Sequence, residues 1–213
     1  MLTRSVFIHT PKTGGQWVAA ALENAGLITG RLGVVHASPD EIWHEPEFQQ
    51  RPFVFAMVRH PLTWYQSMWA HRMDEGWDRD PIDDPEWFTP RWIAIWAEFT
   101  RHCKADTFDE FVHRCVAWQP TGYVSMLYDA YTQHCTFVAR QESLVDDLLT
   151  ALQSAGEPFE PEPILRTPKR NVRAQHSRWL SHCRYTPELI QLVMRAEEQA
   201  ILRFGYRELP ELA

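Results

Sequence analysis

Short apolar runs alternate with longer stretches of helical periodicity along this chain. One run, FVFAMV at residues 53–58, contains no polar residue, which is typical of a strand buried on both faces of a parallel sheet. Three further strands are predicted from the apolar runs at residues 4–10, 32–36 and 135–139. Strands that alternate with helices predict an α/β fold, in which helices flank a parallel sheet in three layers.

The stretches between the apolar runs carry signals for helix ends. Ser38, Pro39 and Glu41 match a capping box with a proline at the first helical position, and Thr107 with Glu110 begins another helix in a similar way. Helices are predicted at residues 15–25, 62–72, 91–103, 107–117, 142–155 and 187–204. Loops are predicted at residues 73–90, which are rich in proline and acidic residues, and at residues 157–173.

Composition and charge narrow the class of protein. The 213 residues, 45% apolar and 23% charged, predict a single globular domain over residues 1–213. The net charge of -7 argues against nucleic acid or an anionic membrane surface as the partner. No apolar run reaches the roughly 18 residues of a membrane span, and no signal peptide precedes the first strand. Together with four cysteines that lack a C-x-x-C pair, these features predict a cytoplasmic protein with reduced thiols.

Three His-Cys dipeptides raise the question of a metal site. They are His102–Cys103, His134–Cys135 and His182–Cys183. Neighbouring side chains on a helix or strand point in different directions, so a dipeptide rarely gives two ligands to one ion. We therefore predict no metal site and attribute the dipeptides to core packing and chance.

The segment FIHTPKTGGQW, residues 7–17, is the first candidate for chemistry. It predicts a strand that enters a glycine-rich turn and then a helix, an arrangement that lets the backbone and the helix N-terminus approach an anion. Lys12 adds a mobile positive charge to that turn. The lysine precedes the glycines, so the segment lacks the G-x-x-x-x-G-K-[ST] signature of mononucleotide-binding loops.

A second anion pocket is predicted after the strand at residues 53–58. Arg59 follows this strand directly, and Ser67 lies eight residues further on, in the next predicted helix. Ligands of open parallel sheets bind beyond the carboxyl ends of the strands, a rule that selects residues 11–17, His36 and residues 59–67. Two anion pockets on neighbouring strand ends predict a ligand with phosphates at two separate positions.

The segments HTPKTGGQW and VRHPLTWYQS together resemble the sulfotransferases that use 3′-phosphoadenosine 5′-phosphosulfate (PAPS), in particular the carbohydrate sulfotransferase branch. FVARQESLVDDLLTAL and YTPELIQLVMRAEEQAILRFGY are similar to later parts of that family. The resemblance reaches from residue 4 to 206 and is loose over residues 74–134. It implies a P-loop-kinase-like fold, no metal, and the product 3′-phosphoadenosine 5′-phosphate (PAP).

The resemblance also implies roles for individual residues. Lys12 would bind the 5′-phosphate and the bridging oxygen as the sulfuryl group leaves, and Trp17 would stack on adenine unless it belongs to the core. Arg59 and Ser67 would take the 3′-phosphate. The backbone around the 5′-phosphate would come from Thr13, Gly14, Gly15 and Gln16, the last replacing the family's usual hydroxyl residue. A basic segment over the cofactor would include Arg166, Lys169, Arg170 and Arg173. Lys169 and Arg170 are candidates for binding the cofactor, and which of the four residues touches it stays open.

Sulfuryl transfer to a hydroxyl needs a base that titrates near neutrality. His36 is the first candidate, because family members with a catalytic histidine carry it in a similar position. The alternative interpretation of His36 is a histidine satisfied by the helix start at Ser38. Glu41 is the second candidate, whereas His44 and His71 are weaker. His9 is expected to point into the core.

Two other functions remain open from the sequence. A nucleotide kinase would need a lysine after the second glycine and an aspartate after the buried strand, where this chain has Arg59. A P-loop-like nucleotide-binding protein without catalysis would have the two anion pockets but no catalytic residues. For an enzyme, the acceptor is predicted to be a hydroxyl of a glycan or small molecule, and the acidic segment 73–90 is expected to form part of its entrance, with Trp77 or Trp87 as a stacking face.

Overall fold

The computed structural model describes residues 1–78, 86–168 and 177–212 and divides the chain into two compact units. The sheet unit consists of Met1–Arg59 and Asp129–Val172, and the helical unit consists of His60–Tyr128 and Arg173–Ala213. Each unit has its own buried side chains. The expectation of a single domain over residues 1–213 stays a prediction.

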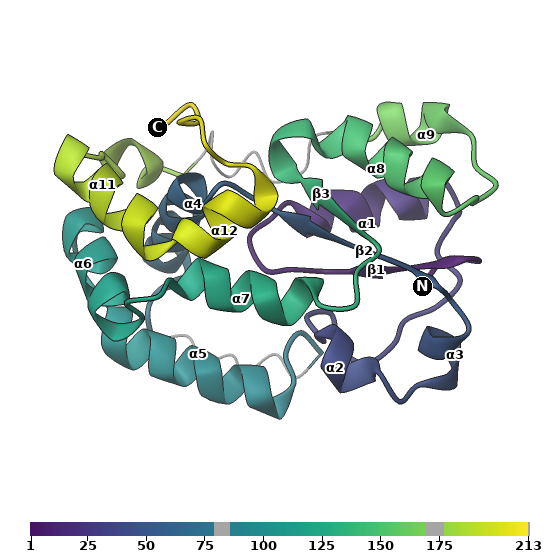
Figure 1. Cartoon of the computed structure of the whole chain (residues 1–213), viewed down its shortest axis with the longest axis horizontal. Helices are drawn as coiled ribbons and strands as arrows, with labels where there is room; N and C mark the ends of the chain where they lie inside the picture. Colours follow the sequence, from purple (N-terminus) through teal and green to yellow (C-terminus); the bar gives the residue numbers. More distant parts are fainter. Residues whose placement is uncertain (79–85, 169–176, 213) are drawn as a thin grey trace. The chain divides into compact units, whose positions relative to one another are not determined.

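A parallel sheet forms the centre of the sheet unit (Figure 1). Its strands in the described residues are β1 (Ser5–Ile8), β2 (Phe53–Val58) and β3 (Phe137–Arg140), in the order β1-β2-β3. Phe7 pairs with Phe55, which in turn pairs with Phe137. Five of the six residues of β2 are buried, as the uninterrupted apolar run predicts for a central strand. The predicted α/β class with helices flanking a parallel sheet is confirmed.

Helices α1 (Gly15–Asn24), α8 (Leu144–Ser154) and α9 (Pro161–Leu165) gather on one side of this sheet (Figure 1). Their apolar faces meet the phenylalanines of the strands in one core cluster. The fully buried members of that cluster include Val18, Ala21, Phe55, Met57, Leu148, Leu152 and Ile164. Burial of these side chains stabilises the sheet unit, and it fixes α1 against the carboxyl end of β1.

Two predictions about the sheet unit are wrong. The run at residues 32–36 forms no strand: it lies in a turn in which the Ala37 N–H donates to the Val34 carbonyl at 3.1 Å. Gly33 has φ 59°, a left-handed conformation that a strand cannot accommodate. The expected loop at residues 157–173 contains α9. The capping box of Ser38 and Glu41 is confirmed at the start of α2 (Pro39–Ile42), which precedes the short α3 (Pro46–Gln49).

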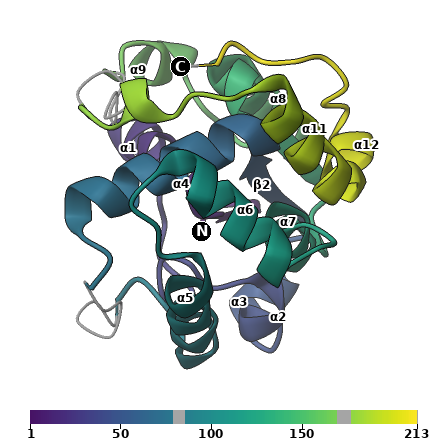
Figure 2. The ribbon, with the colours of Figure 1, turned by 90° about the vertical axis from the view of Figure 1, so that its left-hand side faces the viewer.

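The helical unit contains α4 (Pro61–Glu75), α5 (Pro90–Cys103), α6 (Phe108–Trp118), α7 (Tyr123–Thr132, of which the part from Asp129 on belongs to the sheet unit), η3 (Leu180–His182), α11 (Pro187–Ala196) and α12 (Glu198–Phe204). Helix α4 packs against α6 and α11 (Figure 2). The core is aromatic: the ring of Phe99 lies 4.8 Å from that of Tyr123 and 5.2 Å from that of Trp96. The helices predicted at residues 62–72, 91–103 and 107–117 are confirmed.

Glu197 explains two features of the helical unit that sequence patterns did not predict. This buried residue ends α11 and precedes α12, so the predicted helix 187–204 is two helices. Its carboxylate accepts hydrogen bonds from the backbone N–H groups of Val124 (3.0 Å) and Ser125 (2.7 Å) and from the hydroxyls of Tyr65 and Ser125 (both 2.8 Å). Glu197 therefore caps the N-terminus of α7 from a distant part of the chain.

Replacing Glu197 with glutamine should lower the free energy of unfolding by about 2 to 4 kcal/mol, because an amide NH₂ would face donors that now meet carboxylate oxygens. Chemical denaturation measures this loss. Glu198→Gln is the matched control, since the adjacent side chain is exposed and should change stability little. Equal stabilities of the two variants would contradict the capping role of Glu197.

Candidate active site

The turn between β1 and α1 has the backbone that an anion site requires. Lys12 has φ 66° and Gly14 has φ 88°, so two left-handed residues lie within three positions. Left-handed backbone is uncommon for a residue other than glycine and often marks a functional turn. Gly14 is the N-cap of α1, and the first turn of this helix carries no acidic residue to compete for its N–H groups. The predicted glycine turn followed by a helix is confirmed.

The residues of this turn differ in how accessible they are to a ligand. Thr13 is fully buried, main chain included, and its hydroxyl donates to the Thr10 carbonyl at 2.9 Å, so its expected backbone contact with a ligand stays a prediction. Gln16 is exposed on the first turn of α1, and Lys12 is half-buried. This distribution is compatible with the expected roles of a mobile lysine and of main-chain N–H groups, which stay predictions.

His9 lies at the turn, where its ring packs between Phe7 and the start of α1, in line with the expected inward orientation. Its ring centroid is 4.5 Å from that of His36, and a Cβ atom placed on Gly15 would lie 1.9 Å from the His9 ring. Position 15 is therefore glycine because the imidazole packs directly on the helix start. The strand pattern contains a signal for this placement, since His9 follows Phe7 by two residues and so shares its face of the sheet.

Gly15→Ala should lower the free energy of unfolding by about 1 to 3 kcal/mol, because the new methyl group overlaps the His9 ring. The double variant Gly15→Ala/His9→Ala should recover most of that loss in a thermal or urea denaturation cycle. Gly26→Ala is the control: its φ is 66° and no atom lies within 4 Å of the added Cβ, so His9→Ala should not rescue it. Equal effects of His9→Ala on both glycine variants would contradict the contact.

His36 is held in one orientation by a main-chain group. Its Nδ1 lies 2.8 Å from the His9 carbonyl oxygen. A carbonyl only accepts hydrogen bonds, so Nδ1 carries the proton of the neutral ring and Nε2 carries the lone pair. This is the tautomer that a general base needs. The hydroxyl and N–H of Ser38, the alternative partner, both donate to Glu41.

Burial lowers the pKa of His36 from 6.5 to about 4. Desolvation of the imidazolium is the largest cause, and the nearby Lys12 charge lowers the pKa further, whereas the hydrogen bond to the His9 carbonyl opposes both. The pKa of His9 is also lowered, by burial and by His36. The expectation of a group that titrates near neutrality is thus wrong for His36, whose ring is neutral throughout the physiological range.

Glu41, the alternative base, is engaged elsewhere. Its Oε2 accepts hydrogen bonds from the Ser38 N–H at 2.9 Å and from the Ser38 hydroxyl at 2.8 Å. A carboxylate that already holds a helix start would have to give up this cap to take a proton from an acceptor. The local geometry therefore favours His36 over Glu41. His44 is exposed and His71 is half-buried.

Trp17 belongs to the core of the sheet unit. It is 5% exposed, and its indole N–H donates to the Thr167 carbonyl at 3.4 Å. Stacking of adenine on Trp17 would require the segment at Thr167 to move away. The structure therefore supports the core interpretation of this tryptophan over the expected stacking role.

The two residues of the second predicted pocket belong to different units. Arg59 is the last residue of the sheet unit and follows β2 directly, as predicted, while Ser67 lies within α4 of the helical unit. Their joint binding of a 3′-phosphate stays a prediction. Lys169, Arg170 and Arg173 lie outside the described residues. Arg166 is exposed and its Nε pairs with Glu162 at 2.6 Å.

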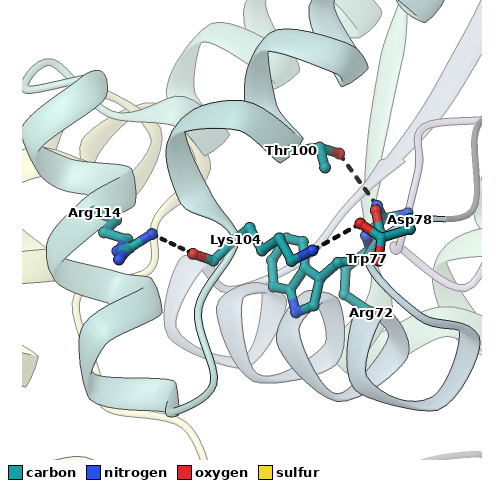
Figure 3. A network of polar contacts seen from close by, with 6 residues as sticks. All are labelled: Arg72, Trp77, Asp78, Thr100, Lys104 and Arg114. Carbon is teal, nitrogen blue, oxygen red and sulfur yellow. Dashed lines mark hydrogen bonds and ion pairs between the residues drawn. The ribbon is translucent and has the colours of Figure 1, made fainter.

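The acidic segment does not present Trp77 for stacking. Trp77 is 7% exposed, and the Arg72 guanidinium lies 5.2 Å from its ring centroid and 5.4 Å from that of Trp96. Arg72 also donates to the Trp77 carbonyl at 2.6 Å and to the Thr100 hydroxyl at 3.1 Å (Figure 3). Trp77 is therefore a core residue of the helical unit, and its expected role at an acceptor entrance is wrong. Residues 79–85 lie outside the described part.

Within the described residues, no three His, Cys, Asp or Glu side chains form a group that could hold a metal ion. None of the helices in the part of the chain that the structure describes is long and apolar enough to cross a membrane. No protein-family model, no curated protein and no solved structure matches this chain.

Proposed function

We propose that this protein is a PAPS-dependent sulfotransferase with a P-loop-kinase-like fold, acting on a hydroxyl of a glycan or small molecule in the cytoplasm. The observation that carries the proposal is the combination of the Lys12 turn with a histidine whose lone-pair nitrogen is defined. The His36 imidazole, with Nδ1 bound to the His9 carbonyl, lies within the electrostatic influence of Lys12. The end of β1 and the residues next to it thus support both proposed parts of the site, phosphate recognition and the general base.

In the proposed reaction, the acceptor oxygen attacks sulfur in line with the bond to the bridging oxygen. A sulfur–oxygen bond forms to the acceptor as the bond to the 5′-phosphate breaks, and its electron pair leaves on the phosphate oxygen of PAP. Lys12 and the N–H groups at the start of α1 would stabilise that developing charge. The acceptor proton passes to Nε2 of His36, which is neutral at physiological pH.

The burial of His36 has a cost and an advantage for this mechanism. A pKa of about 4 makes the imidazole a weaker base than a histidine in water, yet it keeps the ring fully deprotonated while Lys12 carries its charge nearby. In a loose sulfuryl transition state, the acceptor proton leaves late and only in part, so a strong base is not needed. Positioning and charge stabilisation would then account for most of the rate enhancement.

A nucleotide-binding protein without catalysis is the second candidate function. It would use the same Lys12 turn but would have no need for a defined histidine tautomer. A nucleotide kinase is disfavoured because Arg59, rather than an aspartate for Mg²⁺, follows β2. The experiment that separates these functions is an acceptor screen with sulfur-labelled PAPS. A parallel reaction without added acceptor measures transfer of the sulfuryl group to water. Transfer supports the enzyme; nucleotide binding without any release of label supports the binding protein.

A further inference from the structure

Tyr131 makes a contact with His36 that sequence patterns gave no reason to expect. It lies near the C-terminal end of α7, within the sheet unit, and is fully buried. Its hydroxyl donates a hydrogen bond to the His36 main-chain carbonyl at 2.7 Å, across 95 positions of sequence. The contact therefore links α7 directly to the candidate base.

The backbone of His36 lacks the support of a strand. Residues 35 and 36 form a turn, and the nearby Ala37 N–H donates to the Val34 carbonyl at 3.1 Å. A residue in such a turn has no ladder of hydrogen bonds to fix its position. The position of the imidazole then depends on contacts from elsewhere, and the Tyr131 hydroxyl and the His9 carbonyl hold the two ends of the residue.

We propose that Tyr131 is a positioning residue for His36, a role that rests on the proposed sulfuryl-transfer function. The Tyr131 hydroxyl holds the main-chain carbonyl of His36, the His9 carbonyl holds Nδ1, and the ring is restrained between these two points. Nε2 then keeps the lone pair in one place relative to the Lys12 turn. Tyr131 acts through His36 and is not itself a catalytic residue.

The first measurement is independent of any activity. Imidazole ¹⁵N NMR at pH 7 should show His36 of the wild type as the tautomer protonated at Nδ1. In Tyr131→Phe, loss of the restraint on the His36 main chain should weaken the bond between Nδ1 and the His9 carbonyl, so the spectrum should show a mixture that includes the Nε2-protonated tautomer, which predominates for histidine in water.

The second measurement is the release of labelled sulfate from PAPS in water. Tyr131→Phe should lower kcat about 10- to 100-fold, because the base is no longer held in line, while the KM for PAPS stays within about twofold. The matched control is Tyr123→Phe, which removes the hydroxyl of another buried tyrosine in the same helix whose ring packs on Phe99 and Trp64. The control should retain the wild-type kcat and the wild-type His36 spectrum.

The two measurements distinguish failure of the positioning role of Tyr131 from failure of the proposed sulfotransferase function. If the Tyr131→Phe and Tyr123→Phe proteins give the same His36 spectrum and the same kcat, Tyr131 positions nothing and the proposal is overturned. A changed spectrum with an unchanged kcat overturns the positioning role as well, because orientation would then not matter to the chemistry. If wild-type protein releases no sulfate and transfers none to any acceptor, the proposed function fails, whatever the spectrum shows.

Discussion

His36→Ala is expected to lower kcat for sulfuryl transfer by about 10²- to 10⁴-fold, because the variant loses the group that accepts the acceptor proton. Affinity for PAP should stay close to that of the wild type, since His36 is assigned no contact with the phosphates. Steady-state kinetics with labelled PAPS and a separate binding titration measure the two quantities. The residual rate reports what Lys12 and the helix N-terminus achieve without a base.

The control for His36→Ala is His44→Ala, which removes an exposed histidine from the same part of the chain and should leave kcat unchanged. A near-normal kcat in His36→Ala would contradict the base assignment. In that case Glu41→Gln identifies the alternative, because a large loss of kcat in this variant, with its helix start retained, transfers the role to Glu41.

The pH dependence gives an independent check on His36. A base must be deprotonated, so kcat/KM should fall as the pH drops through the His36 pKa of about 4 and stay level between about pH 5.5 and 8. The same lowered pKa makes the unfolded chain bind protons more tightly than the folded one between about pH 6.5 and 4. The contribution of His36 to the free energy of unfolding is therefore fully present above about pH 6.5 and is lost as the pH falls toward 4. An acid limb of kcat/KM near pH 6.5 would contradict the buried, neutral histidine.

Lys12→Ala is expected to lower kcat by about 10²- to 10³-fold and to weaken PAP binding far less. The difference arises because charge on the bridging oxygen develops only as the sulfuryl group leaves, so the lysine contributes more to the transition state than to the bound product. Steady-state kinetics and PAP titration on one preparation give both values. Lys12→Arg keeps the charge but not the compact ammonium group, and should recover binding more completely than kcat.

Lys104→Ala is the matched control for Lys12→Ala. It removes one lysine charge from the helical unit, where Lys104 forms an exposed ion pair with Asp78 at 2.7 Å. Its kcat should be that of the wild type. A Lys12→Ala protein with normal kcat and only a raised KM would show that Lys12 binds the nucleotide without stabilising the leaving oxygen.

The parts of the fold that the sequence predicts are those specified by nearby residues. The apolar run of β2, the caps of α2 and α6, and the glycine turn before α1 each depend on residues within a few positions of one another. Helix α7 was not predicted because its N-terminal N–H groups bind Glu197, more than 70 positions away. The run at residues 32–36 gave a false strand because its apolar composition does not reveal that the chain turns there, with Gly33 at φ 59°.

The candidate site divides in the same way. Lys12, Gly14 and the start of α1 are local, so the pattern of lysine and glycines was enough to select them. The pKa of His36 depends on burial, and its tautomer depends on the His9 carbonyl just beyond β1, neither of which a linear pattern contains. Tyr131 is a tyrosine in an apolar helix face and gave no signal at all. Only the folded chain brings its hydroxyl to His36.

Isothermal titration of the purified protein with PAP and with 5′-AMP tests the central claim most directly, because it needs no knowledge of the acceptor. PAP should bind about 10- to 100-fold more tightly than 5′-AMP, since only PAP carries the 3′-phosphate assigned to Arg59 and Ser67, and a charge-assisted contact contributes roughly 1.5 to 3 kcal/mol. Arg59→Gln should remove most of that preference while leaving AMP binding unchanged. Equal affinity of the wild-type protein for PAP and AMP would contradict the assignment of PAPS as its cofactor.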